Sequence, residues 1–260
     1  GLVPTPDNFG VLGEASSHPE LLDFLAIRFR DEGMSIKKIV REIVTSSTWR
    51  MSSVPDLKAL SMDPTNKLLH HSTIRRLEGE AVRDSMLAVS GRLNPLVGGP
   101  PIEVYLTDFM HGRGRPSSGP LDGDGRRSIY TSIRRNFLPS FMVAFDMPNP
   151  FQAMGRRNVT NVPAQALVLM NDPLVASLAK TWAEKTILEE SQTPRERIES
   201  MYLRAFSRKP QLNEMDDAKV FLVEQAQMHG IDFEKNPRDL AAWTDLAHAL
   251  FNTKEFIFIP

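Results

Sequence analysis

The 260-residue chain contains no cysteine. This absence excludes disulfides, iron–sulfur clusters, thiolate zinc sites, a cysteine nucleophile and a covalently attached c-type haem within these residues. The chain also lacks any apolar run near the ~20 residues that a membrane-spanning helix needs. We therefore expect no membrane span, and no cofactor held by this chain.

An excess of charge of either sign is missing as well. Lysines and arginines number 31 against 32 acids, which gives a net charge of −1. Such a balance indicates no nucleic-acid partner, because binding to a polyanion is driven by a basic surface. The opening, "GLVPTPDNFG", has neither the basic nor the apolar region of a signal peptide. Because Gly1 is not a natural start residue, we interpret the chain as an N-terminally truncated fragment of a longer protein.

The sequence also lacks the motifs that would identify an enzymatic reaction. The chain has no HExxH, no GxSxG and no glycine loop that could cradle a phosphate. "DGDG" at 122–125 begins like a calcium loop, but the twelfth position is Ile133 and not glutamate. We expect a turn there and no metal site.

Helical periodicity dominates both ends of the chain. Apolar residues recur at helical spacing, and the flanking Ser, Thr, Asp, Pro and Gly residues predict helices at about 17–33, 35–45, 77–90, 161–172, 173–190, 193–206, 212–228 and 236–251. Ser17 and Thr193 each begin a sequence typical of a capping box, and either Asn161 or Thr160 is expected to cap the helix that follows them. The fold class is therefore predicted as mainly α, a single multi-helix domain over residues 1–260.

The middle of the chain, residues 92–136, is expected to be an insert rich in loops and strands. Glycine and proline are frequent there, and two segments, 102–106 and 128–134, predict a small β element. The second alternates apolar and polar residues, which would place Tyr130 and Arg134 on one face of a strand.

Arginine is concentrated between residues 111 and 160. Eight arginines face three acids and no lysine in that window, which leaves a local excess of five positive charges. The planar guanidinium binds carboxylates, sulfates or phosphates bidentately, so the choice of Arg over Lys indicates such partners. The arginines either pair with internal acids or form an anion or sugar site. We expect the structural alternative, with Arg134 and Arg156 each meeting a carboxylate or backbone carbonyls.

The segment 156–172, "RRNVTNVPAQALVLMND", places polar groups beside the start of a helix. Four backbone N–H groups at a helix start need partners, and the positive end of the helix favours an anion. The partner could be internal, such as Asp146, or an external anion. The candidate ligand-binding residues are Arg126, Arg127, Tyr130, Arg134, Arg135, Asn136, Arg156, Arg157, Asn161 and Gln165.

Carboxylates offer a second kind of chemistry. Glu80 and Asp84 are one helical turn apart, and Asp146 lies in the arginine-rich window. Paired carboxylates could hydrolyse a glycosidic bond, one as acid and the other as nucleophile or base. The alternative is that Glu78, Glu80 and Asp84 simply pair with the nearby Arg75, Arg76 and Arg83. The sequence leaves open whether the protein is an enzyme.

Long motifs in a fixed order give the chain a resemblance to a family. It resembles the bacterial domain family of unknown function 1553, the PSD-one domain, through segments that include "TPDNFGVLGEASSHPELLDFLAIRF", "SIKKIVREIVTSSTWRMSS", "DPTNKLL", "RRLEGEAVRDSMLAVSGRLN", "RRSIYTSIRRN", "FDMPNP" and "RRNVTNVPAQALVLMND".

The resemblance implies a context. It implies the C-terminal part of a large exported protein, periplasmic or at the cell surface, with a cytochrome-c-like domain and a family 1549 domain as neighbours. The expected function is an accessory or binding module linked to electron transfer or polysaccharide use. If the arginines form an anion site, an anionic or sulfated glycan is the expected ligand. The alternative is a hydrolase acting on a polysaccharide. The resemblance carries no catalytic residues.

Overall fold

The computed structural model describes residues 2–189 and 193–259, and the mainly-α fold is confirmed. The chain divides into two compact units. Unit 1 comprises residues 1–75, 153–156 and 259–260, and unit 2 comprises residues 76–152 and 157–258. That the whole chain forms a single domain stays a prediction.

Unit 1 contains three helices that bury no residue. They are α1 (Pro19–Asp31), α2 (Ile36–Thr45) and α3 (Leu57–Met62). The apolar stripe of α2 predicts a buried face, but Ile43 in this stripe is 37% exposed. Among the described residues of unit 1 only Asp63 is buried, so this unit has no hydrophobic core of its own.

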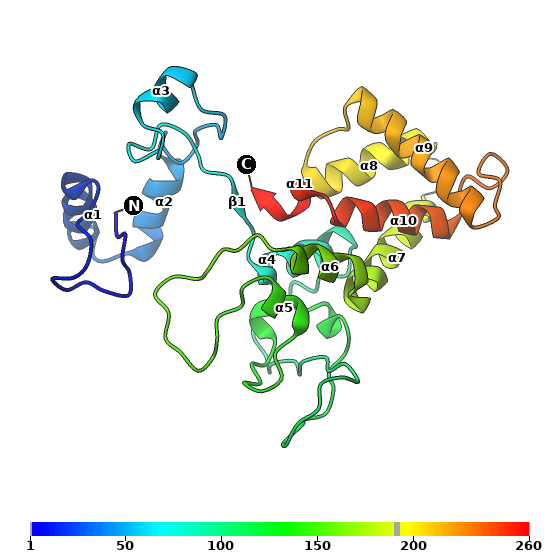
Figure 1. Ribbon diagram of the computed structural model, residues 1–260, viewed down its shortest axis with the longest axis horizontal. Helices are drawn as coiled ribbons and strands as arrows, with labels where there is room; N and C mark the ends of the chain where they lie inside the picture. The colour runs from blue at the N-terminus through cyan, green and yellow to red at the C-terminus, as the bar shows by residue number, and fades with distance from the viewer. Residues whose placement is uncertain (1, 190–192, 260) are drawn as a thin grey trace. The chain divides into compact units, whose positions relative to one another are not determined.

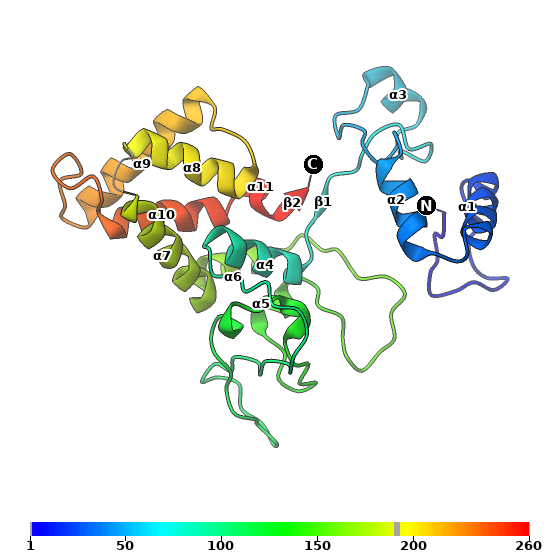
Figure 2. The same ribbon diagram turned by 180° about the vertical axis from the view of Figure 1, so that it is seen from behind.

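Unit 2 contains the remaining helices and nearly all of the core (Figure 1). Its helices are α4 (Gly79–Val89), α5 (Ser140–Ala144), α6 (Pro163–Asn171), α7 (Pro173–Leu188), α8 (Pro194–Phe206), α9 (Leu212–Met228), α10 (Leu240–Phe251) and α11 (Lys254–Ile257). Helices α8, α9 and α10 lie side by side in both views, and α10 also packs along α7 (Figures 1 and 2).

Two tryptophans occupy the centre of this core. Trp182 of α7 and Trp243 of α10 are both 0% exposed, and the ring of Trp182 lies 5.1 Å from that of Phe251. Burying a large side chain contributes about 1.5–3 kcal/mol relative to leaving it in water. The burial of both side chains therefore stabilises the packing of α7 on α10. Helices α4 and α6, which carry the polar residues discussed below, pack against α7.

The observed helix boundaries agree with those predicted from the sequence better than the observed caps do. The capping box of Thr193 with Glu196 is confirmed. The other two cap predictions are wrong: α1 begins after His18 and α6 after Val162, and neither start has a side-chain cap. Asn161 is exposed, and the neighbouring Thr160 is held by another partner described below.

The β element also lies outside the segment in which the sequence predicts it. The two-stranded sheet consists of β1 (Arg75–Arg76) and β2 (Phe258–Ile259), outside the insert at 92–136. Within the described insert, β structure is limited to isolated bridges such as Ile102 with Thr131. Residues Ser128–Tyr130 form a 3₁₀ turn, so Tyr130 and Arg134 do not share the face of a strand.

Leu169 on α6 tests this packing, because it is 1% exposed while Leu167 on the same helix is 58% exposed. We expect Leu169→Ala to lower the free energy of unfolding by about 2–5 kcal/mol, since it leaves a cavity in the core. Leu167→Ala is the matched control and should stay within about 0.5 kcal/mol. Urea denaturation measures both, and equal effects would contradict the placement of α6.

Candidate functional site

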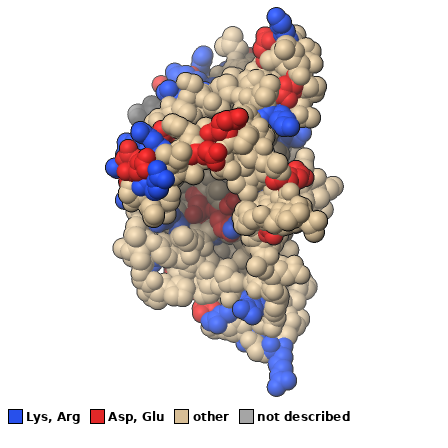
Figure 3. Space-filling model, turned by 90° about the vertical axis from the view of Figure 1, so that its left-hand side faces the viewer, with Lys and Arg blue, Asp and Glu red and all other residues tan. Residues whose placement is uncertain are grey.

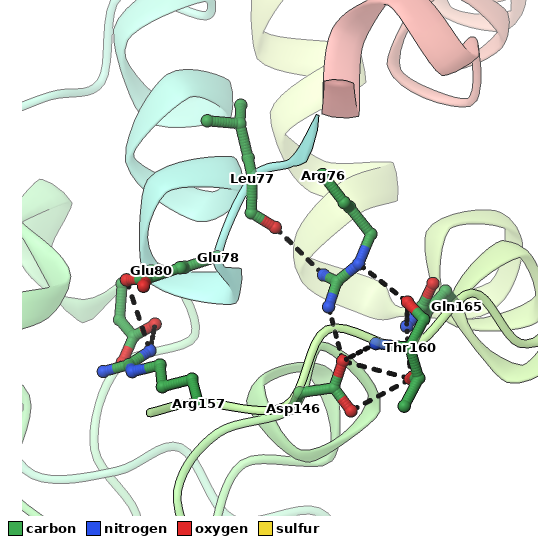
Figure 4. Close-up of polar contacts among 8 residues, drawn as sticks. All are labelled: Arg76, Leu77, Glu78, Glu80, Asp146, Arg157, Thr160 and Gln165. Atoms are coloured by element: carbon green, nitrogen blue, oxygen red, sulfur yellow. Dashed lines mark hydrogen bonds and ion pairs between the residues drawn. The ribbon is translucent and has the colours of Figure 1, made fainter. Parts of the chain in front are cut away.

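The carboxylate of Asp146 is the centre of a polar cluster in unit 2 (Figure 4). Asp146 follows α5 in the left-handed conformation, with φ at 61°, a region that Asp tolerates better than most residues. Thr160 donates its backbone N–H to Oδ2 at 2.8 Å and its hydroxyl to Oδ1 at 2.9 Å. The segment before α6 is thereby held to the residue that follows α5.

Arg76 completes this cluster and bonds to both Asp146 and Thr160 (Figure 4). Its side chain is 3% exposed, and it donates to Asp146 Oδ2 at 2.5 Å, to the Thr160 carbonyl at 3.0 Å and to the Leu77 carbonyl at 2.9 Å. The guanidinium also lies over the ring of Phe145, 5.1 Å from its centroid. A buried ion pair with this many hydrogen bonds is satisfied internally, whereas either partner alone would be costly.

Gln165 joins the same cluster from the first turn of α6. Its side chain is buried, and its amide donates to the Thr160 carbonyl at 3.2 Å. The side-chain oxygen of Gln165 has no partner among the described residues. The first turn of α6 is therefore anchored by Gln165, and not by the predicted cap at Asn161.

Glu80 and Arg157 form a second pair (Figure 4). The guanidinium of Arg157 meets both carboxylate oxygens of Glu80, at 2.7 and 3.0 Å, and lies 3.4 Å from Glu78. Burial raises the pKa of Glu80, but the hydrogen bonds and charge of Arg157 outweigh that effect and leave the pKa below its usual value. The same hydrogen bonds raise the pKa of Arg157. Glu80 is therefore ionised at neutral pH.

Asp84 and Arg83 hold the 3₁₀ turn at residues 128–130. Asp84 Oδ1 accepts the backbone N–H of Ser128 at 2.8 Å and its hydroxyl at 2.7 Å. Arg83 donates to the Ser128 hydroxyl and to the carbonyls of Arg126 and Asp122. Burial lowers the pKa of Arg83, although its neighbouring acids oppose the shift. This bonding to α4 is the physical reason that the segment forms a turn and not a strand.

Tyr130 lies beneath two arginines. The guanidinium carbons of Arg126 and Arg127 lie 4.3 and 5.7 Å from its ring centroid. The phenol oxygen accepts the Gly98 N–H at 2.9 Å, and this bond is the main cause of a lowered Tyr130 pKa, with Arg127 next. Arg126 also donates to the Gly98 carbonyl at 2.5 Å. These contacts hold the loop around residue 98 against the 3₁₀ turn at residues 128–130.

The remaining candidates are exposed and do not gather around one ligand site. Arg134 pairs with Glu103 at 2.5 Å, with 46% and 35% of the two side chains exposed, and this pair lowers the pKa of Glu103. Arg135 lies 5.7 Å from the ring centroid of Phe151. Asn136 and Arg156 are exposed, and within the described ranges Arg156 meets no carboxylate, so the expected partner for Arg156 was wrong.

Three residues that hold the site were absent from the candidate set: Arg76, Arg83 and Thr160. Arg83 lies 3.4 Å from Asp84, as the alternative of internal pairing predicts, but Arg76 pairs with Asp146, which is 70 residues away along the chain. A cavity of about 70 Å³ lies beside Arg83 and Glu103, well below the roughly 300 Å³ of a small ligand pocket. Glu80, Asp84 and Asp146 are thus bound by groups of their own chain and do not line this cavity.

No metal site is apparent in the described ranges, where no three or more His, Asp or Glu side chains come together as metal ligands would. No helix among the same residues is both long and apolar enough to cross a membrane. Basic and acidic side chains are interspersed on the face drawn in Figure 3, without a large field of one sign.

Fold and site together define a mainly-α protein whose polar centre consists of internal arginine–carboxylate pairs. The chain belongs to the PSD1 family, described as protein of unknown function (DUF1553), whose model matches residues 1–222. No curated protein and no solved structure shows significant similarity to the chain.

The Arg76–Asp146 pair predicts a large loss of stability when one partner is removed. Arg76→Met should lower the free energy of unfolding by about 3–5 kcal/mol, because Asp146 keeps its charge without its buried partner. Arg156→Met serves as the control, since Arg156 is exposed, and should stay within about 0.5 kcal/mol. Chemical denaturation measures both variants, and a minor loss for Arg76→Met would refute the structural role of the pair.

The Glu80–Arg157 pair predicts a pH dependence. Because the pKa of Glu80 is lowered in the folded state, its contribution to stability is fully present above the unfolded value of about 4.3. That contribution disappears as the pH falls through the folded value. The difference in unfolding free energy between the parent and Glu80→Gln should therefore shrink from pH 6 to pH 3. A difference in unfolding free energy that stays constant from pH 6 to pH 3 would contradict a stabilising ion pair between Glu80 and Arg157.

Proposed function

We propose that this chain is a non-catalytic accessory module of an exported, multidomain bacterial protein, and that its polar centre holds loops in place. The observation that carries the proposal is the state of the three candidate carboxylates. Glu80 is bound by Arg157, Asp146 by Arg76 and Thr160, and Asp84 by Ser128. Each of these carboxylates accepts hydrogen bonds from groups of its own chain.

The alternative, a polysaccharide hydrolase, finds less support in this arrangement. Hydrolysis by paired carboxylates needs one that is protonated at working pH and a cleft in which both reach the sugar. The lowered pKa of Glu80 removes it as a proton donor at neutral pH. The cavity near Asp84's partner Arg83 is too small for a sugar ring with its neighbours.

The wider context of the proposal rests on the resemblance given above. The module would lie beside cytochrome-c-like and family 1549 domains of the same polypeptide, in the periplasm or at the cell surface. Any link to electron transfer or polysaccharide use would then come through these neighbours. An anionic or sulfated glycan is the ligand class to test at the arginine-rich loops, because Arg135 and Arg156 are exposed and pair with no carboxylate in the described residues.

A glycan array with neutral and sulfated oligosaccharides, read for both binding and release of reducing ends, tests the proposal. We expect no release by the parent chain, and therefore no difference between the parent and Glu80→Gln. Binding of a sulfated glycan, if present, should weaken with salt, because the exposed arginines are screened. Release of reducing ends by the parent that Glu80→Gln abolishes would establish the hydrolase instead.

A further inference from the structure

A large cavity lies within unit 1, whereas the polar centre described above belongs to unit 2. Its volume is about 880 Å³, within the roughly 300–1,000 Å³ typical of small-molecule sites. One part of its wall comes from α1 and α2, and another from the loop at residues 63–73. All the residues that line it belong to unit 1.

The wall of this cavity is largely apolar. Phe24, Leu25, Ile43, Trp49 and Leu68 contribute to it. Several of these side chains are strongly exposed, with Phe24 at 52%, Trp49 at 50% and Leu68 at 72%. Since the helices of unit 1 bury no residue, this apolar surface is not covered by unit 1 itself. The apolar part of a ligand would remove this surface from water.

Two arginines give the cavity a positive charge. Arg50 and Arg75 line it, and neither pairs with a carboxylate in the part of the chain that the structure describes. The guanidinium of Arg75 lies 5.6 Å from the ring centroid of Trp49. The acid in the wall, Glu42, is already engaged by Arg28 at 3.2 Å. The charge left without a partner is therefore positive and complements an anion.

The loop that completes the wall is held in shape by its own hydrogen bonds. The Asp63 carboxylate accepts the N–H groups of Lys67 and Leu68, at 2.9 and 2.7 Å. Asn66 accepts from the His70 N–H and donates to the His71 carbonyl. Hydrogen bonds to the Leu68 and Lys67 amides lower the pKa of Asp63 against the effect of burial. This part of the wall exists before any ligand arrives.

We propose that the unit 1 cavity binds a small amphiphile, with an apolar body against the α1–α2 wall and an anionic head group at Arg50 and Arg75. A guanidinium recognises a carboxylate or a phosphate in the same bidentate manner, so either head group satisfies the site. The proposal is independent of the role given to the polar centre in unit 2.

Trp49 provides a local reporter for the test. The chain has three tryptophans, and the other two, Trp182 and Trp243, are fully buried in unit 2. The full chain is titrated with dodecanoate and, separately, with dodecyl phosphate, both below micelle formation, and the tryptophan emission is recorded. We expect a saturable change with at least one of the two probes and its loss in Trp49→Phe. Dodecanol and acetate, which lack the charge or the chain, should bind at least about tenfold more weakly.

Calorimetric titration of charge variants tests the head-group assignment. Arg50→Gln and Arg75→Gln should each weaken the binding of the probe about tenfold, while Arg50→Lys should weaken it less because the charge remains. Arg30→Gln is the matched control, since Arg30 pairs with Asp31 on α1 and does not line the cavity. Equal affinity for dodecanoate and dodecanol, or variants that bind as the parent does, would overturn the proposal. Tight binding of an acidic peptide with no binding of either amphiphile would also overturn it.

Discussion

The bond network of the Asp146 carboxylate is the constraint on which the centre of unit 2 depends. One carboxylate joins the end of α5, the segment before α6 and the strand β1 through Thr160 and Arg76. These three segments are up to 84 residues apart in sequence, as the Arg76–Thr160 bond shows. A carboxylate that is only 15% exposed is costly to leave without hydrogen bonds, so the segments that bond it are held together.

Carboxylates of helix α4 form similar contacts, one of them to the insert at residues 92–136. One turn of this helix holds Arg157 through Glu80, and the next holds the turn at Ser128 through Asp84. Some arginines of the middle, such as Arg157 and Arg126, thus bond to groups of their own chain, because a loop-rich region does not satisfy its carbonyls and acids by regular ladders. Planar guanidinium groups, each with five donors, satisfy several acceptors at once. Arg83 does so for three loop residues.

The sequence predicted the helices well and the polar contacts poorly, for physical reasons. Helical periodicity and the Thr193–Glu196 capping box are local, so they can be read within one or two turns. The partner of Ser128 lies 44 residues away, and the partner of Arg76 lies 70 residues away, so no local pattern reports them. The apolar stripe of α2 predicts burial, but periodicity does not say what covers the stripe. In unit 1 one residue of the stripe, Ile43, lines a cavity and does not pack in a core.

If the arginine–carboxylate centre is an internal structural network, Arg76 and Asp146 must be energetically coupled, and a double-mutant cycle between them measures this coupling. The cycle compares the unfolding free energies of the parent, Arg76→Met, Asp146→Asn and the double variant. Residues that share a buried network show a coupling of roughly 0.5–3 kcal/mol, and we expect a value in the upper half of that range. A coupling near zero, with variants that are each as stable as the parent, would contradict the account.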